Sequence, residues 1–262
     1  MADQAEGDPL DLIRSPVLAG VPHAFLGRAG GVSSGQVAGL QFGLGAGDDA
    51  ADVAENRRRA VAAILPGAEL AMPYQVHSPD VVIAQAAWAH EDRPRADAVV
   101  TDVPGLLLGV VTADCAPILL ADHEAGIVGA AHAGWRGAQG GVIEATLAAM
   151  ESLGARADRV AAAIGPCIGQ ASYEVDAPFR KHFSEDDACF FAEGKAGHWQ
   201  FDLEGYVASR LGRAGVGVID PLGLDTYGTE SGSLQRFYSY RRATHRGEAN
   251  YGRQASLIGI AA

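Results

Sequence analysis

The sequence predicts an α+β fold, and three observations support it. Short apolar runs typical of strands lie along much of the chain, each bounded by Gly, Pro or Asp. Segments with helical periodicity stand between them, without the regular alternation of a doubly wound sheet. The apolar share is 48% and the chain has 34 glycines, as expected for a compact protein rich in turns. Because no low-complexity linker, repeat or block of like charge divides it, we expect residues 1–262 to form a single domain.

The predicted strands are short and mostly apolar, which indicates a substantial amount of sheet. They are Val81–Ala84, Leu106–Val111, Ile118–Ala121, Ile127–Ala131, Val160–Ile164, Val216–Ile219 and Ser256–Ile260.

Two segments in the second half of the chain predict helices. The first spans 142–153, and Gly154 suits the position just after a helix end. Its apolar face carries Ile143, Thr146, Leu147 and Met150. Asp202 is a suitable N-cap for a second helix over 203–213, and Gly215 lies just beyond its end.

A third predicted helix lies in "GDDAADVAENRRRAVAAILPG", residues 47–67. Asp48 or Asp49 offers the N-cap and Pro66 ends the helix. Its apolar stripe consists of Val53, Ala60, Val61 and Ile64. With about 100° of rotation per residue, Arg57 falls near the middle of this stripe and is expected to point inward.

An inward arginine has two interpretations. In the structural one, Arg57 extends to the edge of the core or pairs with a buried carboxylate. In the functional one, its permanently charged guanidinium binds phosphate or carboxylate through a planar fork of donors. Either interpretation requires a partner for Arg57.

Composition excludes several classes of protein. With 20 Lys plus Arg against 32 Asp plus Glu, the net charge of −12 repels the phosphate backbone of a nucleic acid. Residues 1–18 lack the basic start and apolar core of a secretory signal, and the longest apolar stretch, 105–121, is interrupted by Asp114. We therefore expect a cytoplasmic protein with no membrane span, while the oligomeric state has no clear signal in the sequence.

Three segments place potential metal ligands beside apolar runs: "YQVHSPD" with His77, "TADCAPI" with Cys115 and "AAHAGWRG" with His132. Two neutral imidazoles and one thiolate suit Zn²⁺, and three protein ligands leave a fourth position for water or substrate. The spacing alone is not diagnostic, because Cys is often a small buried residue and His in a turn is often only hydrogen-bonded. A metal-free alternative makes Cys115 a nucleophile and His132 its base.

The remaining cysteines and histidines have simpler interpretations. Because three cysteines form no paired pattern, they are expected as thiols, and Cys167 and Cys189 as packing residues. The other histidines lie in polar or irregular surroundings and are expected to be exposed: His23, His90, His123, His182, His198 and His245. Asp114 is expected mainly to shape the turn that presents Cys115.

Successive motifs along the chain resemble those of the YfiH-like family, also called the laccase-domain, multicopper polyphenol oxidase or peptidoglycan editing factor family. They are "GRAGGVSSG" (27–35), "GDDAADVAENRRR" (47–59), "QVHS" (75–78), "ADAVVT" (96–101), "TADCAPILL" (112–120), "AHAGWRG" (131–137), "GPCIG" (165–169), "YSYRR" (238–242) and "GRQASLIGI" (252–260). The resemblance covers nearly the whole chain. It implies an α/β/β/α layered fold shared with bacterial toxins that use a Cys–His pair, and a metal site formed by His77, Cys115 and His132.

The resemblance also implies an activity. The family carries out phosphorolysis of purine nucleosides (adenosine, inosine, guanosine and methylthioadenosine), with adenosine deamination as a second reaction. The expected small-molecule partners are therefore a purine nucleoside and phosphate. Cys115, His132 and Arg57 are the expected catalytic residues, and Arg57 is expected to bind substrate. Arg28, in "GRAGG", and Arg136, in "GWRG", are weaker candidates for anion contacts.

Zinc is the expected metal, with copper second. Copper-dependent oxidation of phenols, the older assignment in the family, requires many more histidine ligands in one place than the sequence offers. Two further hypotheses are an amide hydrolase using Cys115 and His132 on cell-wall precursors, and a metal-stabilised interaction protein without activity. The sequence departs from the family's usual pattern at Gln41 and Gly45, where relatives commonly have Asn and His, and residues 224–232 lack a Cys-Thr pair.

Overall fold

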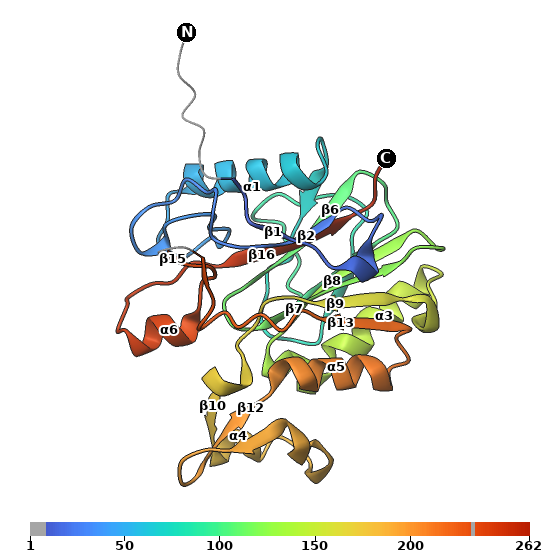
Figure 1. Cartoon of the computed structure of the whole chain (residues 1–262). Helices are drawn as coiled ribbons and strands as arrows, with labels where there is room; N and C mark the ends of the chain where they lie inside the picture. Colours follow the sequence, from blue (N-terminus) through green and yellow to red (C-terminus); the bar gives the residue numbers. More distant parts are fainter. Residues whose placement is uncertain (1–8, 232–233) are drawn as a thin grey trace.

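Two β-sheets packed face to face form the centre of the protein (Figure 1). The computed structural model describes residues 9–231 and 234–262. Residues 1–8 of the N-terminal stretch, which showed no secretory signal in the sequence, lie outside the described residues. Gly232, at the end of the segment 224–232 that departs from the family pattern, also lies outside them. No helix in the described part of the chain has the length and apolarity needed to cross a bilayer.

The first sheet has five strands. Their order is β1 (Leu12–Ile13), β2 (His23–Leu26), β16 (Gln254–Gly259), β6 (Leu106–Thr112) and β3 (Glu69–Ala71). The second sheet has six strands in the order β13 (Val218–Pro221), β9 (Ala161–Ile164), β7 (Ala116–Asp122), β8 (Ile127–Ala133), β5 (Ala98–Thr101) and β4 (Val81–Ile83).

Helices cover the outer face of each sheet. Helix α1 (Ala50–Ile64) lies on the five-stranded sheet, while α3 (Val142–Ser152) and α5 (Leu203–Arg213) lie on the six-stranded sheet (Figure 1). One apolar core fills the space between the two sheets, and a further core lies under each helical layer. This arrangement confirms the predicted α/β/β/α fold.

The central strands are apolar throughout because both faces of their sheet are covered. Every residue of β7 and β8 is buried. This explains why the predicted strands were continuous apolar runs rather than alternating ones. The strands missed by the sequence analysis include β2 and β5, which have only four residues each.

The long helices follow the sequence signals. Helix α5 begins after Asp202, whose side chain accepts a hydrogen bond from Gly205 N, and α3 ends just before Gly154, where φ is +111°. Asp49, rather than Asp48, caps α1. The buried face of α1 differs from the predicted stripe: it consists of Val53, Asn56, Ala60 and Ile64. Arg57 lies beside this face rather than at its centre.

A smaller unit projects from the six-stranded side of the protein, at the bottom of Figure 1. We call residues 174–202 the aromatic lobe. It holds a three-stranded sheet in the order β10 (Glu174–Asp176), β12 (His198–Phe201) and β11 (Phe191–Glu193), together with α4 (Ala177–Arg180). Its interior is a cluster of rings, among them Phe179, Phe183, Phe191 and Phe201. The sequence analysis did not predict this unit.

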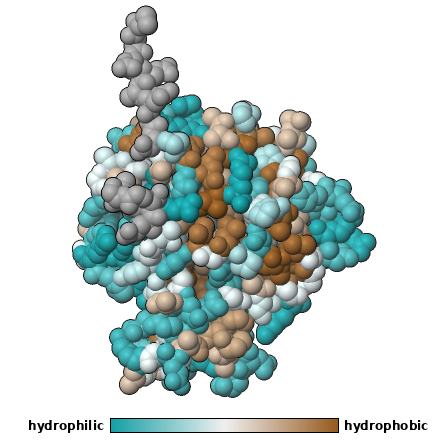
Figure 2. All heavy atoms as spheres, in the orientation of Figure 1, coloured by the Kyte–Doolittle hydropathy of each residue, from teal (hydrophilic) through white to brown (hydrophobic). Residues whose placement is uncertain are grey.

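Two further short α-helices and one further pair of strands lie outside the two large sheets and the lobe. Helix α2 (Trp135–Gly140) follows β8, α6 (Tyr240–His245) precedes β16, and β14 (Glu230–Ser231) pairs with β15 (Leu234–Gln235). On the face seen in Figure 2 the surface is largely hydrophilic, with hydrophobic patches over the central sheets. Three expectations about burial were wrong. His23 and His198 were expected to be exposed, but His23 is buried in β2 and His198 is half-buried. Cys189 was expected to be a packing residue, but it is exposed.

Candidate active site

His77, Cys115 and His132 converge at one end of the central hairpin. Their potential ligand atoms all lie within 4.8 Å of one another. The register of β7 and β8 pairs Pro117 with His132, so Cys115, just before β7, is brought beside the end of β8. His77 comes from the loop between β3 and β4, and its ring meets that of His132 nearly at a right angle. Folding therefore joins three segments that are separate in the sequence.

Asp97 holds two of these three residues in place. Its Oδ1 atom accepts hydrogen bonds from His132 Nδ1, at 2.7 Å, and from the backbone N–H of His77, at 2.9 Å. Its Oδ2 atom accepts from Val76 N, Ser78 N and Ser78 Oγ. Because Nδ1 of His132 is engaged by Asp97, Nε2 is the atom left to bind a ligand.

Asp97 is an ionised carboxylate despite its complete burial. Burial alone would raise the pKa of Asp97, but the hydrogen bonds from His132 and from the backbone of Ser78 and Val76 hold it well below the usual range. The lowered pKa of Asp97 keeps a negative charge facing His132 at neutral pH.

Two strained backbone positions lie at the site, one at the candidate ligand His77 and one at Asp114, directly before Cys115. His77 has φ of 61° and Asp114 has φ of 85°, and no other non-glycine residue in the described ranges has a positive φ. Asp114 is held by Thr226 Oγ1, which donates to Oδ1 at 2.7 Å, and by Arg241 N, which donates to Oδ2 at 2.6 Å. Asp114 thus fixes the turn that presents Cys115, as the sequence predicted.

Cys115 and His132 form a charged pair. Burial would raise the pKa of the Cys115 thiol, but the charge of His132 and hydrogen bonds from His132 and His77 outweigh it and bring the pKa to about 6. Burial would lower the pKa of His132, yet Cys115 and Asp97 raise it to about 9. At neutral pH a thiolate therefore faces an imidazolium.

The donor set fits a zinc ion. Two imidazoles and a thiolate are preferred zinc ligands, and a carboxylate on the far nitrogen of a ligand histidine is the usual supporting contact. The absence of a side chain at Gly134 leaves room for Cys115 and His77. A Cβ at this position would lie 2.8 Å from Cys115 Sγ and 3.3 Å from His77 Cδ2. Within the described ranges, no other group of three or more His, Cys, Asp or Glu side chains is placed to hold a metal.

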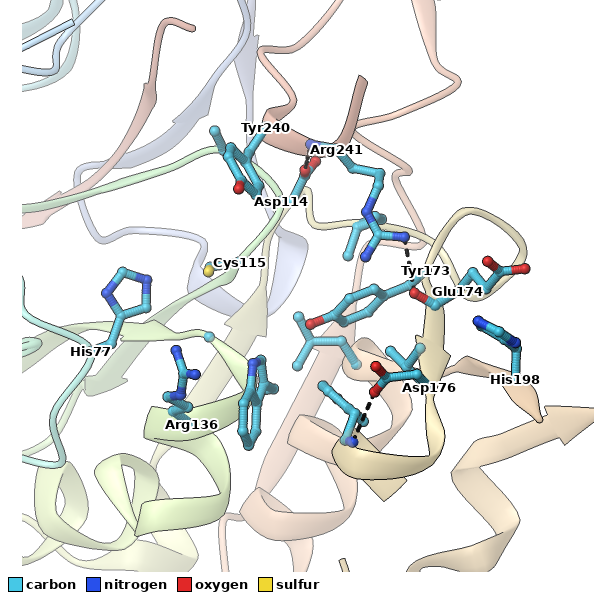
Figure 3. Close-up of a pocket in the computed structure, with 17 residues that line it drawn as sticks. His77, Asp114, Cys115, Arg136, Tyr173, Glu174, Asp176, His198, Tyr240 and Arg241 are labelled. Carbon is cyan, nitrogen blue, oxygen red and sulfur yellow. Dashed lines mark hydrogen bonds between the residues drawn. The ribbon is translucent and has the colours of Figure 1, made fainter. Parts of the chain in front are cut away.

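Two cavities meet at this group and share His77, Ala113 and Cys115 in their walls. We call the first, of about 220 Å³, the arginine cavity, because Arg57, Arg93 and Arg253 line it. We call the second, of about 520 Å³, the aromatic cavity (Figure 3). Its walls include Trp135, Arg136, Tyr173, Phe179, Tyr240 and Arg241.

The arginine cavity is suited to an anion. None of its described lining residues is acidic, and none of its three arginines forms a salt bridge with a described residue. Arg57 donates from Nη2 to the carbonyl of Phe42 at 2.8 Å, while its Nε is buried without a hydrogen-bond partner. Burial, assisted by the charge of Arg93, lowers the pKa of Arg57 to about 10. The guanidinium stays charged at neutral pH and pairs with no carboxylate among the described residues.

The other two arginine candidates lie in different places. Arg136 lines the aromatic cavity, and its guanidinium lies 4.7 Å from the centre of the Trp135 ring. Arg28 lines neither cavity: it donates to the carbonyl of Ala38 and lies over the ring of Tyr238. The structure therefore brings Arg57 and Arg136 to the site and leaves Arg28 in a neighbouring loop.

Sequence reasoning missed several residues of the site. Asp97 stands directly before the apolar run 98–101, where an acidic residue at a strand start attracts no attention. Arg93 and Tyr173 lie outside the family motifs, and Arg253 lies within the motif of residues 252–260 but was given no role. The fold brings all three to the cavities.

Comparisons with known proteins agree with this architecture. A family model described as multi-copper polyphenol oxidoreductase laccase matches residues 22–261. A Deinococcus radiodurans protein named purine nucleoside phosphorylase is 42% identical over 254 residues, covering 96% of this chain and 93% of the relative. A Streptomyces griseus protein of the same type is 40% identical over 230 residues, covering 87% and 92%.

Solved structures are similar along the whole chain. A Neisseria meningitidis protein superimposes with a TM-score of 0.84 at 33% identity, covering 97% of this chain and 99% of its own. YlmD from Geobacillus stearothermophilus gives a TM-score of 0.85 at 30% identity, covering 100% and 98%. The layered fold is thus shared by proteins that differ from this one at most positions.

Proposed function

The chain belongs to the multi-copper polyphenol oxidoreductase laccase family, also called the YfiH-like family, and we propose that it is a zinc-dependent purine nucleoside phosphorylase. The observation that carries the proposal is the arginine cavity, which lacks described acidic residues and opens directly onto the His77–Cys115–His132 group. The names of the relatives from Deinococcus radiodurans and Streptomyces griseus supply the substrate class.

The arginine cavity would hold inorganic phosphate. Three guanidinium groups without carboxylate partners provide both charge and directed donors, which suit the oxygens of a phosphate ion. Arg57 is the anchor because its Nε is buried and has no hydrogen-bond partner among the described residues. Arg93 and Arg253, on two neighbouring loops, would donate further hydrogen bonds to the phosphate.

Phosphorolysis requires only the nucleoside and phosphate as reactants. An oxygen of HPO₄²⁻ forms a bond to C1′ of the ribose while the bond from C1′ to the purine nitrogen breaks. The electron pair of that bond leaves with the purine, which takes up the proton that the phosphate brought. The arginines position the phosphate and offset its charge as the new bond forms.

His77, Cys115 and His132 would hold the zinc ion, with Asp97 orienting His132. When bound, zinc supplies a Lewis acid, a fixed positive charge that draws electron density from a substrate atom. Copper-dependent phenol oxidation is the less favoured alternative, because the described residues offer a single group of three ligands rather than several histidine clusters.

Adenosine deamination, the second reaction implied by the family, requires a group that transfers protons near the purine. Asp114 is poorly suited to this role, since both of its oxygens already accept hydrogen bonds, from Thr226 and from the backbone of Arg241. We therefore propose phosphorolysis as the principal reaction.

A second candidate function is favoured by one observation. Cys115, His132 and Asp97 form a chain of thiolate, imidazolium and carboxylate, which is the constellation of a cysteine hydrolase. Such a site would cleave an amide of a cell-wall precursor. Removal of metal separates the two functions, because it abolishes a zinc-dependent reaction and exposes a thiol nucleophile.

The test is the release of free base from inosine and adenosine, with and without phosphate, by protein of measured zinc content. The proposal expects release that requires phosphate and is lost in Cys115→Ala, with melting temperature measured alongside. Protein that holds one zinc per chain and releases no base would contradict it, and amide hydrolysis by the chelated protein would favour the second candidate.

A further inference from the structure

We infer that the aromatic cavity is the subsite for the purine base and that Tyr173 binds the base there, an inference that rests on the proposed phosphorolysis. The cavity adjoins the metal-ligand group on the side of the aromatic lobe (Figure 3). Neither the sequence motifs nor the ligand set singles out Tyr173.

The two cavities meet at His77, Ala113 and Cys115 and otherwise take their walls from different elements, which provides two separate places for the two reactants of a displacement. In phosphorolysis the attacking phosphate oxygen and the departing base lie on opposite sides of C1′. The arginine cavity takes its separate walls from residues 42–44, α1 and 251–253, whereas the aromatic cavity takes them from α2, the aromatic lobe and α6. Helix α1 and the lobe lie at opposite ends of the molecule in Figure 1. With phosphate in the arginine cavity, the base is directed into the other.

The sizes and charges of the cavities agree with this division. The arginine cavity, at about 220 Å³, suits a small ion, and the aromatic cavity, at about 520 Å³, accommodates a base. The aromatic cavity is lined by the carboxylates of Asp114, Glu174 and Asp176 as well as by Arg136 and Arg241, so it lacks the excess of positive charge that would select an anion (Figure 3). A neutral, flat, hydrogen-bonding group is the ligand that fits such a lining.

Planar groups form the walls on which a purine can stack. The guanidinium of Arg241 lies 5.2 Å from the centre of the Tyr173 ring, and that of Arg136 lies 4.7 Å from the centre of the Trp135 ring. Tyr240, with 52% of its surface exposed, lines the cavity from α6. Each of these residues is fixed on a helix or beside a strand of the lobe, so the walls are formed before a ligand arrives.

Tyr173 offers the base a polar contact from one wall of the cavity. Its ring packs edge-on against Phe179 and Phe201, while its hydroxyl points into the cavity toward the side of Cys115 (Figure 3). The hydroxyl forms no hydrogen bond with any residue in 9–231 or 234–262. The neighbouring carboxylate of Glu174 is instead paired with Lys195 at 2.7 Å. The Tyr173 hydroxyl is thus free to donate to a ring nitrogen of the purine.

The test measures KM for inosine and KM for phosphate separately in Tyr173→Phe, which removes only the hydroxyl. We expect KM for inosine to rise about tenfold, as for loss of one buried hydrogen bond, with KM for phosphate unchanged. Tyr206→Phe is the matched control, because Tyr206 belongs to the same ring cluster but lines neither cavity. Tyr240→Leu, at an exposed position on the opposite wall, provides a second variant that does not disturb the core.

The outcomes separate this inference from the proposed function. Wild-type protein without phosphate-dependent base release would overturn the proposed function, and the base subsite with it. Active wild-type protein whose KM for inosine is unchanged in both Tyr173→Phe and Tyr240→Leu would overturn the base subsite alone. An equal rise in both KM values, or a rise in the Tyr206→Phe control, would also overturn it, because a general disturbance of the site would then explain the effect.

Discussion

Asp97 Oδ1 lies 2.7 Å from His132 Nδ1, and the same oxygen accepts the backbone N–H of His77. One buried atom therefore fixes the ring of the first ligand and the position of the second. The Asp97 carboxylate therefore has two functions. It sets the tautomer of His132, and it holds the loop that carries His77.

Replacing Asp97 should therefore weaken zinc binding. We expect Asp97→Asn to lower zinc affinity by about 10- to 100-fold, since the amide supplies one acceptor and places donors against the N–H groups of the loop. Competition with a chromophoric chelator measures the affinity. Asp122→Asn is the control, because Asp122 is a buried carboxylate of the same sheet that pairs with Arg159 away from the site. Equal affinities for wild-type protein and Asp97→Asn would refute the role given to Asp97.

Gly134 should be intolerant of even a methyl group. Its φ of −66° is open to alanine, so the backbone is not the obstacle. The added Cβ would lie 2.8 Å from Cys115 Sγ, and we expect Gly134→Ala to reduce zinc content with a smaller effect on melting temperature. Gly137→Ala is matched, since its Cβ would meet no atom closer than 3.5 Å. Full zinc occupancy in both variants would show that the close approach is not required.

Arg57 should act on phosphate rather than on the nucleoside. In Arg57→Met the apolar length of the side chain is kept and the charge is lost, so we expect at least about a tenfold rise in KM for phosphate with little change in KM for inosine. Arg58→Met is the control, because Arg58 is exposed and pairs with Glu55 on the same helix. A rise in KM for inosine alone would contradict the prediction, because it would show that Arg57 acts on the nucleoside and not on phosphate.

The Cys115 thiol should titrate at an unusually low pH in metal-free protein. A pKa of about 6 means that the thiolate is present above that pH and disappears as the pH falls through it. Alkylation by iodoacetamide after chelation should therefore rise over about one pH unit either side of 6. Subtracting the labelling of Cys115→Ser removes the contribution of the exposed Cys189. A midpoint near the usual thiol range would mean that His132 and His77 do not stabilise the thiolate.

The central layers of the fold could be predicted because strands that are buried on both faces appear in the sequence as continuous apolar runs. Strands β7 and β8 are covered on both faces, so their residues are uniformly apolar. The aromatic lobe gave no such signal, since its strands have three or four residues and include Glu174, Asp176 and His198. Its rings pack on one another, and this clustering appears only when the chain is folded.

The candidate ligands and two arginines of the site, Arg57 and Arg136, could be predicted from the sequence, whereas most of the other residues around them could not. Cys and His beside apolar runs are unusual enough to draw attention, and the family resemblance selects the same three residues. Asp97 lies in the motif of residues 96–101, but an acidic residue at the start of a strand gives no sign that it contacts a histidine. Arg93 and Arg253 are separated from Arg57 by long stretches of chain, and only the packing of their loops brings them to one cavity.

The three proposed ligands differ in how firmly the fold holds them. His132 belongs to the buried strand β8, and Cys115 directly precedes buried β7, whereas His77 is exposed and lies on a loop. In hydrogen–deuterium exchange the amides of β7 and β8 should open only with the whole protein, while those around His77 open locally. The residence time of the metal would then be governed by the movement of a single loop, with two ligands remaining in place to receive the next ion.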